Sequence, residues 1–155
     1  MTQKGSPTQG DVYNWHELTD VVTTRASATN LTSGTMVYQN GTSGITVVPT
    51  TAIDAGRVRF LPVGVDNSAG AAGDFEVETI KTGAIVVAKC DGVIVVGDRV
   101  ITSGTTAGQV AASNATSTTP ETSIGVYLGH VGELEGTAND PSNSVDADLV
   151  VIQMD

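Results

Sequence analysis

The sequence contains few of the residues from which most catalytic and nucleic-acid-binding sites are built. Its 155 residues include one cysteine, two histidines and six aromatic side chains, and only 15% of them are charged. The single cysteine, Cys90, excludes an internal disulfide. Lys and Arg number seven against 17 Asp and Glu, which gives a formal net charge of −10. Because phosphate backbones repel such a chain, and because no stretch clusters its basic residues, we expect no nucleic-acid partner.

Long apolar runs are also missing. No stretch of apolar residues is long enough to cross a bilayer, and the first nine residues are polar, unlike the apolar part of a signal peptide. We therefore expect no membrane partner and a protein made in a cytoplasm. A chain of this length forms one domain, or one domain with an arm, and can bury a sizeable core.

Valine, threonine and glycine dominate what is present, with 22 Val, 22 Thr and 18 Gly. β-Branched side chains pack well on a pleated sheet, and glycine allows the tight turns between strands. We predict an all-β fold, either a small β-barrel or β-tulip or a sandwich of short antiparallel strands, with an extended N-terminal arm. Strands are expected at Thr35–Gln39, Ile45–Val48, Arg57–Val63, Asp74–Ile80, Ala84–Lys89, Val93–Val96, Arg99–Thr102, Gln109–Ala112, Ile124–Leu128 and Ala147–Met154.

The strand pattern occurs twice along the chain. A hairpin over Ser33–Val48 and a later strand pair over Pro62–Ile80 resemble a hairpin over Val96–Ala112 followed by Ser123–Met154. The spacing drifts by several residues between the two copies. This pattern suggests two similar halves around one core.

Aromatic residues concentrate near the N-terminus, where Asp11–Leu18 holds the only Trp. We predict an N-terminal arm over residues 1–28, partly flexible, and a β-barrel domain over residues 29–155, with Val21–Thr35 as a strand edge or linker. Large aromatic side chains are favoured anchors at protein interfaces. The alternative is that Trp15 packs on the protein's own core. The candidate partner-binding residues are Tyr13, Trp15, His16 and Leu18.

Motifs that carry catalysis are absent. The sequence has no G-x-S-x-G, H-E-x-x-H, P-loop or G-x-G-x-x-G pattern, and its two imidazoles, His16 and His130, have no matching nucleophile in a strained turn. Asp146 and Asp148 share one face of a predicted strand and could supply oxygen ligands to a cation, although a solvated acidic edge explains them as well. We expect a protein that is not an enzyme and that holds no cofactor and no metal.

Several short motifs follow one another in a characteristic order. They are S-G-x-x-V-x-x-x-G at Ser33–Gly41, V-G-V at Val63–Val65, A-x-G-D-x-x-V at Ala71–Val77, G-D-x-V at Gly97–Val100, G-x-V at Gly108–Val110, I-G-V at Ile124–Val126, and a closing strand with Asp148, Val151 and Ile152. In this order they resemble the capsid decoration proteins of tailed phages, also called cement or head-stabilising proteins. The segment through Ser27 departs from that pattern.

The resemblance implies a non-enzymatic structural protein of the virion, made in the host cytoplasm and bound to the outer surface of an icosahedral capsid. It also implies the major capsid protein as partner, bridging of its subunits, and a homotrimer at local threefold axes. The alternatives are a head-fibre component, or a small surface adhesin or carbohydrate-binding domain. A sugar site needs an exposed aromatic platform, and the aromatics after residue 20 fall in predicted strands: Tyr38, Phe60, Phe75 and Tyr127.

Overall fold

The computed structural model describes residues 8–26, 33–39, 46–49, 58–62, 76–113, 123–130, 144 and 149–155. Within these residues the chain forms short strands and a single 3-10 helix, which confirms the predicted all-β fold. No helix in these ranges is long and apolar enough to cross a bilayer. The elements are η1 (Trp15–Glu17), β1 (Val21–Ala26), β2 (Met36–Gln39), β3 (Thr46–Pro49), β4 (Val58–Phe60), β5 (Glu76–Ile80), β6 (Ile85–Lys89), β7 (Arg99–Thr102), β8 (Val110–Ala112), β9 (Gly125–His130) and β10 (Leu149–Met154).

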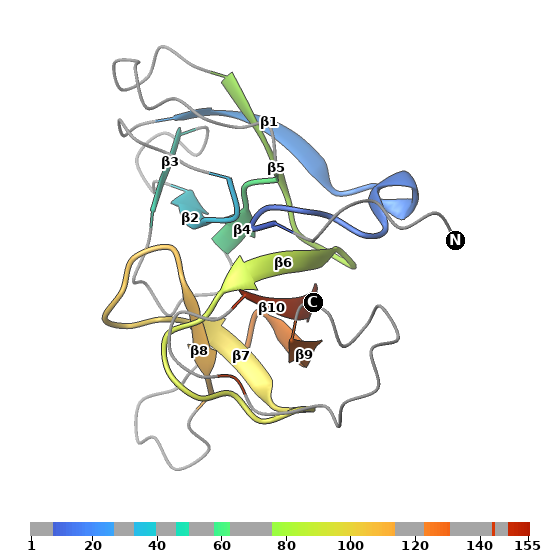
Figure 1. The fold of residues 1–155 in the computed structure, drawn as a ribbon. Coiled ribbons are helices and arrows are strands. Elements are labelled where there is room, and N and C mark those ends of the chain that lie inside the picture. The colour runs from blue at the N-terminus through green and yellow to red at the C-terminus, as the bar shows by residue number, and fades with distance from the viewer. Residues whose placement is uncertain are drawn as a thin grey trace.

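The strands form two sheets that lie one above the other (Figure 1). The first sheet has the order β1-β3-β2-β4-β5, and it closes into a small barrel because β1 also pairs with β5. Five antiparallel residue pairs join β1 to β5, from Val21 opposite Ile80 to Arg25 opposite Glu76. The pairing of β1 with β3 is parallel, whereas the other strand pairs of this sheet are antiparallel.

The second sheet has the order β6-β10-β9-β7-β8, and all of its strand pairs are antiparallel. An isolated parallel bridge joins Cys90, just after β6, to Val110 in β8. The Asp91 N–H also donates to the Val110 carbonyl at 2.8 Å. These contacts bring the two outer strands together, so the second sheet curves round as the first one does.

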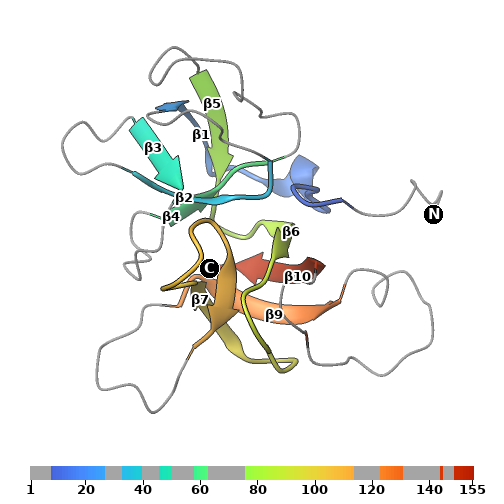
Figure 2. The same ribbon diagram turned by 60° about the vertical axis from the view of Figure 1, so that its left-hand side comes forward.

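The two sheets repeat one topology when β1 to β5 are matched in order to β6 to β10 (Figure 2). Each pair of neighbouring strands in the first sheet then has a corresponding pair in the second; the pairing of β1 with β5, for example, corresponds to that of β6 with β10. The repeat extends to the parallel contact of each sheet: the bridge of Cys90 to Val110 in the second sheet corresponds to the pairing of Ala26 with Val47 in the first.

Turn geometry repeats as well. The Gly34 N–H donates to the Leu61 carbonyl at 2.7 Å, and the Gly97 N–H donates to the Tyr127 carbonyl at 3.2 Å. Both glycines have a positive φ, of 79° and 87°, a conformation that most L-residues avoid. Topology and turns together agree with the internal repeat that the sequence predicts.

One hydrophobic core extends through both sheets. Most of its members are β-branched or aromatic residues, and along β4, β6 and β10 they occupy every second position, so their side chains point to the same face. Residues between them, such as Val87 and Val151, are buried as well. The buried cluster comprises Met36, Val58, Phe60, Ile80, Ala84, Val86, Ala88, Cys90, Ile94, Val100, Val110, Ile124, Tyr127, Val150, Ile152 and Met154.

Nine of the ten predicted strands overlap an observed strand, and the prediction for Val93–Val96 is wrong. Ile94 bonds both of its backbone groups to one residue: its N–H donates to Ser144 Oγ at 2.7 Å and its carbonyl accepts from the Ser144 N–H at 3.0 Å. Gly92 and Gly97 flank the run with positive φ values. The Val95 N–H and carbonyl are bonded to Asp98 in the following turn. The backbone groups of this run are therefore engaged by Ser144 and by its own turn, and not by a neighbouring strand, in spite of its high β-propensity.

The segment Val21–Ala26 is a full strand, β1, rather than the strand edge or linker that its composition indicates. Thr-rich segments read as linkers when only polarity is considered, but threonine is β-branched and suits a sheet. Residues 10–14 of the predicted arm also lie against the fold, along β6, where Val12 bridges to Val86. The predicted boundary between residues 28 and 29 lies outside the described residues.

Candidate functional site

Most exposed large apolar side chains of the described residues lie in one short segment. They are Tyr13 (45% exposed), Trp15 (39%), Val21 (37%), Val22 (37%), Val93 (58%) and Val95 (46%). Four of these six fall between residues 13 and 22. We call residues 13–20 the aromatic loop, since it carries both exposed aromatic side chains and leads directly into β1.

The first end of the aromatic loop is fixed by Asn14. Its Nδ2 donates to the Gly83 carbonyl at 2.7 Å, and its Oδ1 accepts from the Ile85 N–H at 2.8 Å. The amide side chain thereby satisfies two backbone groups at the start of β6, as an added strand would. The 3-10 helix η1 that follows, Trp15–Glu17, buries none of its residues.

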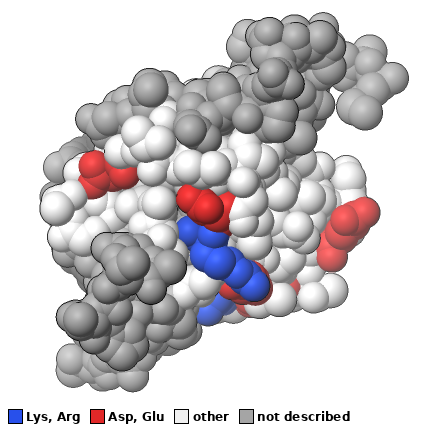
Figure 3. Space-filling model, turned by 90° about the horizontal axis from the view of Figure 1, so that it is seen from below, with Lys and Arg blue, Asp and Glu red and all other residues white. Residues whose placement is uncertain are grey.

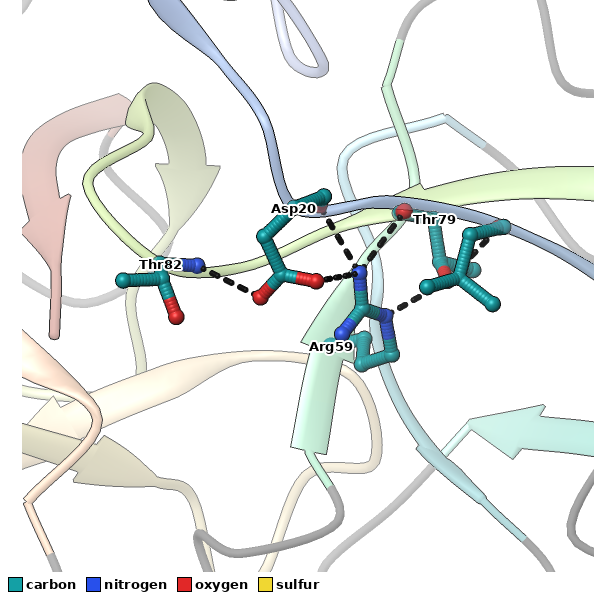
Figure 4. A network of polar contacts seen from close by, with 5 residues as sticks. Asp20, Arg59, Thr79 and Thr82 are labelled. Carbon is teal, nitrogen blue, oxygen red and sulfur yellow. Dashed lines mark hydrogen bonds and ion pairs between the residues drawn. The ribbon is translucent and has the colours of Figure 1, made fainter.

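The second end of the loop is fixed by Asp20, immediately before β1 (Figure 4). Its Oδ2 accepts from the Thr82 N–H at 3.1 Å, and its Oδ1 accepts from Arg59 Nη2 at 2.8 Å. Thr82 and Gly83 are adjacent in the turn between β5 and β6. Both ends of the aromatic loop are thus hydrogen-bonded to the same turn, and these bonds fix the position of the loop that carries Tyr13 and Trp15.

Arg59, whose side chain is only 8% exposed, is the cation that makes this attachment possible. It lies on β4, and its Nε donates to Thr79 Oγ1 at 2.8 Å while its Nη2 also donates to the Thr79 and Asp20 carbonyls, at 3.0 and 2.9 Å (Figure 4). A buried charge is tolerated when it is paired and hydrogen-bonded. Arg59 therefore joins β1, β4 and β5 through one polar network.

This network makes the stability of the protein depend on pH. The hydrogen bond from Arg59 lowers the pKa of the Asp20 carboxyl below its ordinary value. Its stabilising contribution is then fully present above the unfolded pKa of about 3.9 and is lost as the pH falls through the folded value. We expect the difference in unfolding free energy between wild type and Asp20→Asn, measured by urea denaturation, to shrink as the pH falls from about 7 to about 2. A difference that stays constant over that range would contradict this role.

The structure separates the four predicted partner-binding residues into two groups. Tyr13, Trp15 and His16 are exposed or largely exposed, whereas Leu18 is half-buried and packs on the core. Leu18 is thus an internal anchor of the loop. Trp15 is not part of the buried cluster, so of the two alternatives for this residue the structure favours the accessible one. Binding of a partner by these residues stays a prediction.

Sequence reasoning missed Asn14, Asp20 and Arg59, which hold the loop in place. One signal was available: Arg59 is the single charged residue in the apolar run from Val58 to Leu61, and a charge there requires a buried partner. Nothing in the sequence identifies Asp20 as that partner.

A second polar cluster braces the hairpin between β7 and β8. Asp91 accepts hydrogen bonds from the hydroxyls of Ser103 and Thr105, the latter at 2.6 Å. The bond from Ser103, followed by that from Thr105, lowers the pKa of the Asp91 carboxyl. Both hydroxyls point at the same oxygen of Asp91, so this cluster ties a loop down and is not an open site.

No group of three or more His, Cys, Asp or Glu gathers among the described residues in a way that could hold a metal ion. Asp146 and Asp148 lie outside the described residues, as does the side chain of His130. Figure 3 shows one face of the molecule, on which the described surface is mostly uncharged and the basic side chains in view lie against acidic ones.

The aromatic residues that follow the aromatic loop in the sequence expose little ring surface on which a sugar could stack. Phe60 and Tyr127 are buried, and Tyr38 is half-buried against the core. Phe75 lies outside the described residues. A stacking surface in the described part of the chain is therefore confined to Tyr13 and Trp15.

These features define an all-β domain of two repeated five-stranded sheets with one exposed, fixed aromatic loop. No protein-family model matches the chain, and no curated protein matches it. Among solved structures it is similar to the head fiber gp8.5 N base in bacteriophage phi29, with a TM-score of 0.49 and 16% sequence identity. That match covers 87% of this chain and 92% of the other. The function of this chain must therefore be argued from its own residues.

Proposed function

We propose that this protein is a structural component of a phage virion, without enzymatic activity, that binds the outer surface of the icosahedral capsid. It stabilises the capsid by bridging major capsid protein subunits, as a trimer at local threefold axes. One observation carries the proposal: a chain poor in aromatics holds Tyr13 and Trp15 exposed on a loop attached at both ends. The order of the sequence motifs, which resembles that of decoration proteins, supports the same class.

Attachment of both loop ends favours binding. An exposed aromatic side chain contributes most at an interface when little conformational freedom is lost on association. Asn14 and Asp20 have already removed much of that freedom in the free protein. A ligand that binds only the assembled capsid stabilises it by about 2.7 kcal/mol per site at a hundredfold excess over Kd. Repeated over every site of a capsid lattice, this contribution resists internal pressure without any chemistry.

The direct test is a binding measurement on capsids that lack this protein. Purified protein is mixed with such capsids, the capsids are sedimented, and the copies bound per capsid are counted. Saturation at a number that matches the threefold positions or the subunits of the lattice supports the proposal. Failure to bind mature capsids removes it and favours the adhesin or head-fibre alternatives, which a glycan array then separates.

Trp15→Ala is expected to weaken capsid binding by about 2 kcal/mol, or roughly 30-fold in Kd, because it removes the largest exposed side chain of the loop. The measurement is a sedimentation isotherm for each variant. Val95→Ala, which shortens an exposed side chain outside the loop, is the matched control and should bind as wild type does. Unchanged binding by Trp15→Ala would remove the loop from the interface. Deleting the whole segment is a poorer test, because Val12 and Leu18 pack on the core.

A further inference from the structure

The outer edge of β6 carries an added strand supplied by the chain itself. Residues 10–14 run antiparallel to β6 with Val12 opposite Val86. Asn14 completes the edge through its side chain, which accepts from the Ile85 N–H. Three backbone hydrogen bonds of 2.9 Å hold the segment there: Gly10 N–H to the Val87 carbonyl, Val87 N–H to the Asp11 carbonyl, and Tyr13 N–H to the Ile85 carbonyl.

The internal repeat identifies the counterpart of this edge on β1. The two strands can be matched at both ends. At the first end, the pair of Val21 with Ile80 corresponds to the pair of Ile85 with Gln153. At the other end, the pair of Ala26 with Val47 corresponds to the bridge of Cys90 with Val110. Residues 21, 22 and 23 therefore occupy the positions of residues 85, 86 and 87. The segment that lies along β6 marks where a strand would lie along β1.

Among the described residues, no strand occupies this position on β1. The Val22 carbonyl accepts from Thr79 Oγ1 on β5 at 3.2 Å, so the backbone groups of its neighbours Val21 and Thr23 face the opposite edge, because strand residues alternate. In the part of the chain that the structure describes, β3 pairs along that edge at Arg25 and Ala26 alone. Residues 21–23 are all exposed, and no described segment lies along them as residues 10–14 lie along β6.

We propose that the outer edge of β1 at Val21–Thr23 is a docking edge for an extended strand of a partner protein, which adds antiparallel to β1. The geometry is the one that residues 10–14 already realise on β6. An unpaired edge with two exposed valines is otherwise a liability that natural sheets cover or charge. Backbone bonds supply affinity in such strand addition, and alternate side chains supply selectivity.

The added strand on β6 also indicates what the partner strand should contain. Val12 faces Val86 as a close, non-hydrogen-bonded pair, so a β-branched residue is expected opposite Val22. Asn14 follows Tyr13, the residue opposite Ile85, and its side chain accepts from the Ile85 N–H in place of a backbone carbonyl. An Asn or Asp therefore fits one position beyond the residue opposite Val21, where its side chain can accept from the Val21 N–H. The edge begins where the aromatic loop ends, so one partner can contact both. That this partner is the major capsid protein rests on the proposed function, whereas the docking edge itself does not.

The edge is tested first without any capsid. A synthetic peptide of residues 8–16 is added at millimolar concentration to the ¹⁵N-labelled full-length protein, and amide hydrogen exchange is followed by NMR. We expect the amides of Val21 and Thr23 to exchange at least tenfold more slowly, while that of Val22, already directed to β5, is unchanged. Val22→Lys should abolish this protection, and Val93→Lys, at a more exposed valine outside the edge, should leave it intact. Absence of protection in the wild type overturns the docking edge.

The capsid experiment then distinguishes this inference from the proposed function. Val22→Lys is expected to weaken capsid binding at least tenfold while its urea midpoint remains that of Val93→Lys. Normal capsid binding by Val22→Lys would show that the capsid does not bind at this edge, and it would leave the proposed function unaffected. Wild-type protein that fails to bind capsids overturns the proposed function alone, since the peptide experiment does not depend on it.

Discussion

Arg59→Ala is expected to destabilise the protein by about 3 to 5 kcal/mol, as measured by urea denaturation. The substitution removes a guanidinium that is 8% exposed and makes four hydrogen bonds to Asp20 and Thr79. Asp20 then keeps its charge without its cation, and the carbonyl of the buried residue Thr79 loses a donor. The cost comes mainly from these groups being left unpaired in a low-dielectric environment.

The matched control for Arg59 is Arg99. Its ion pair with Asp155 has a similar length, 2.9 Å against 2.8 Å, but its side chain is 57% exposed. Arg99→Ala should cost no more than about 1 kcal/mol, because water and salt screen exposed pairs. Equal losses for the two variants would mean that burial of Arg59 contributes nothing. Arg59→Lys should give an intermediate loss, since it keeps the charge but not the planar fork of donors.

Gly125→Ala is expected to cost about 3 kcal/mol, at the upper end of the range for inserting a methyl group into a packed interior. Gly125 lies on β9 between β7 and β10, opposite Val100 on one side and Met154 on the other. A Cβ added there would overlap the Gln153 carbonyl oxygen and lie 3.1 Å from Met154 Cα. These are backbone atoms, so the strands themselves would have to move apart.

Gly104→Ala provides the comparison, because a Cβ at that position meets nothing within 4 Å. Its unfolding free energy should stay within about 0.5 kcal/mol of the wild type. Thermal denaturation of both variants, supported by near-UV circular dichroism, measures the difference. A tolerated Gly125→Ala would show that the contact between β9 and β10 is looser than the structure indicates.

The strands were predictable because their signal is local. β-Branched runs bounded by glycine or Asn-Gly and Asp-Gly turns identified nine strands, and β7 was predicted with its observed ends, Arg99 and Thr102. The same local signal failed at Val93–Val96, where the outcome depends on Ser144, a residue far along the chain. It also failed at β1, whose threonines resemble a linker until β5 is present to pair with them.

The candidate site was predictable only in part. A cluster of aromatics in an aromatic-poor chain marks Tyr13 and Trp15 without any structure. The attachment of their loop depends on contacts across long sequence separations, from Asn14 to Gly83 and from Asp20 to Arg59. A single sequence does not show which residues pair: Arg59 is conspicuous as a charge in an apolar run, but nothing marks Asp20 as its partner or Gly83 as the partner of Asn14.

By itself, the sequence determined that this protein is an all-β domain with two similar halves, because strand propensity, turn residues and alternation act over only a few positions. It also determined the acidic charge and the scarcity of catalytic groups. Tertiary structure alone decided which strand edges are covered. Residues 10–14 fill the edge of β6, while the equivalent edge of β1 at Val21–Thr23 stays exposed. The physical reason is that hydrogen bonds between strands join backbone groups, which are the same in every residue, so only the folded arrangement decides which of them are paired.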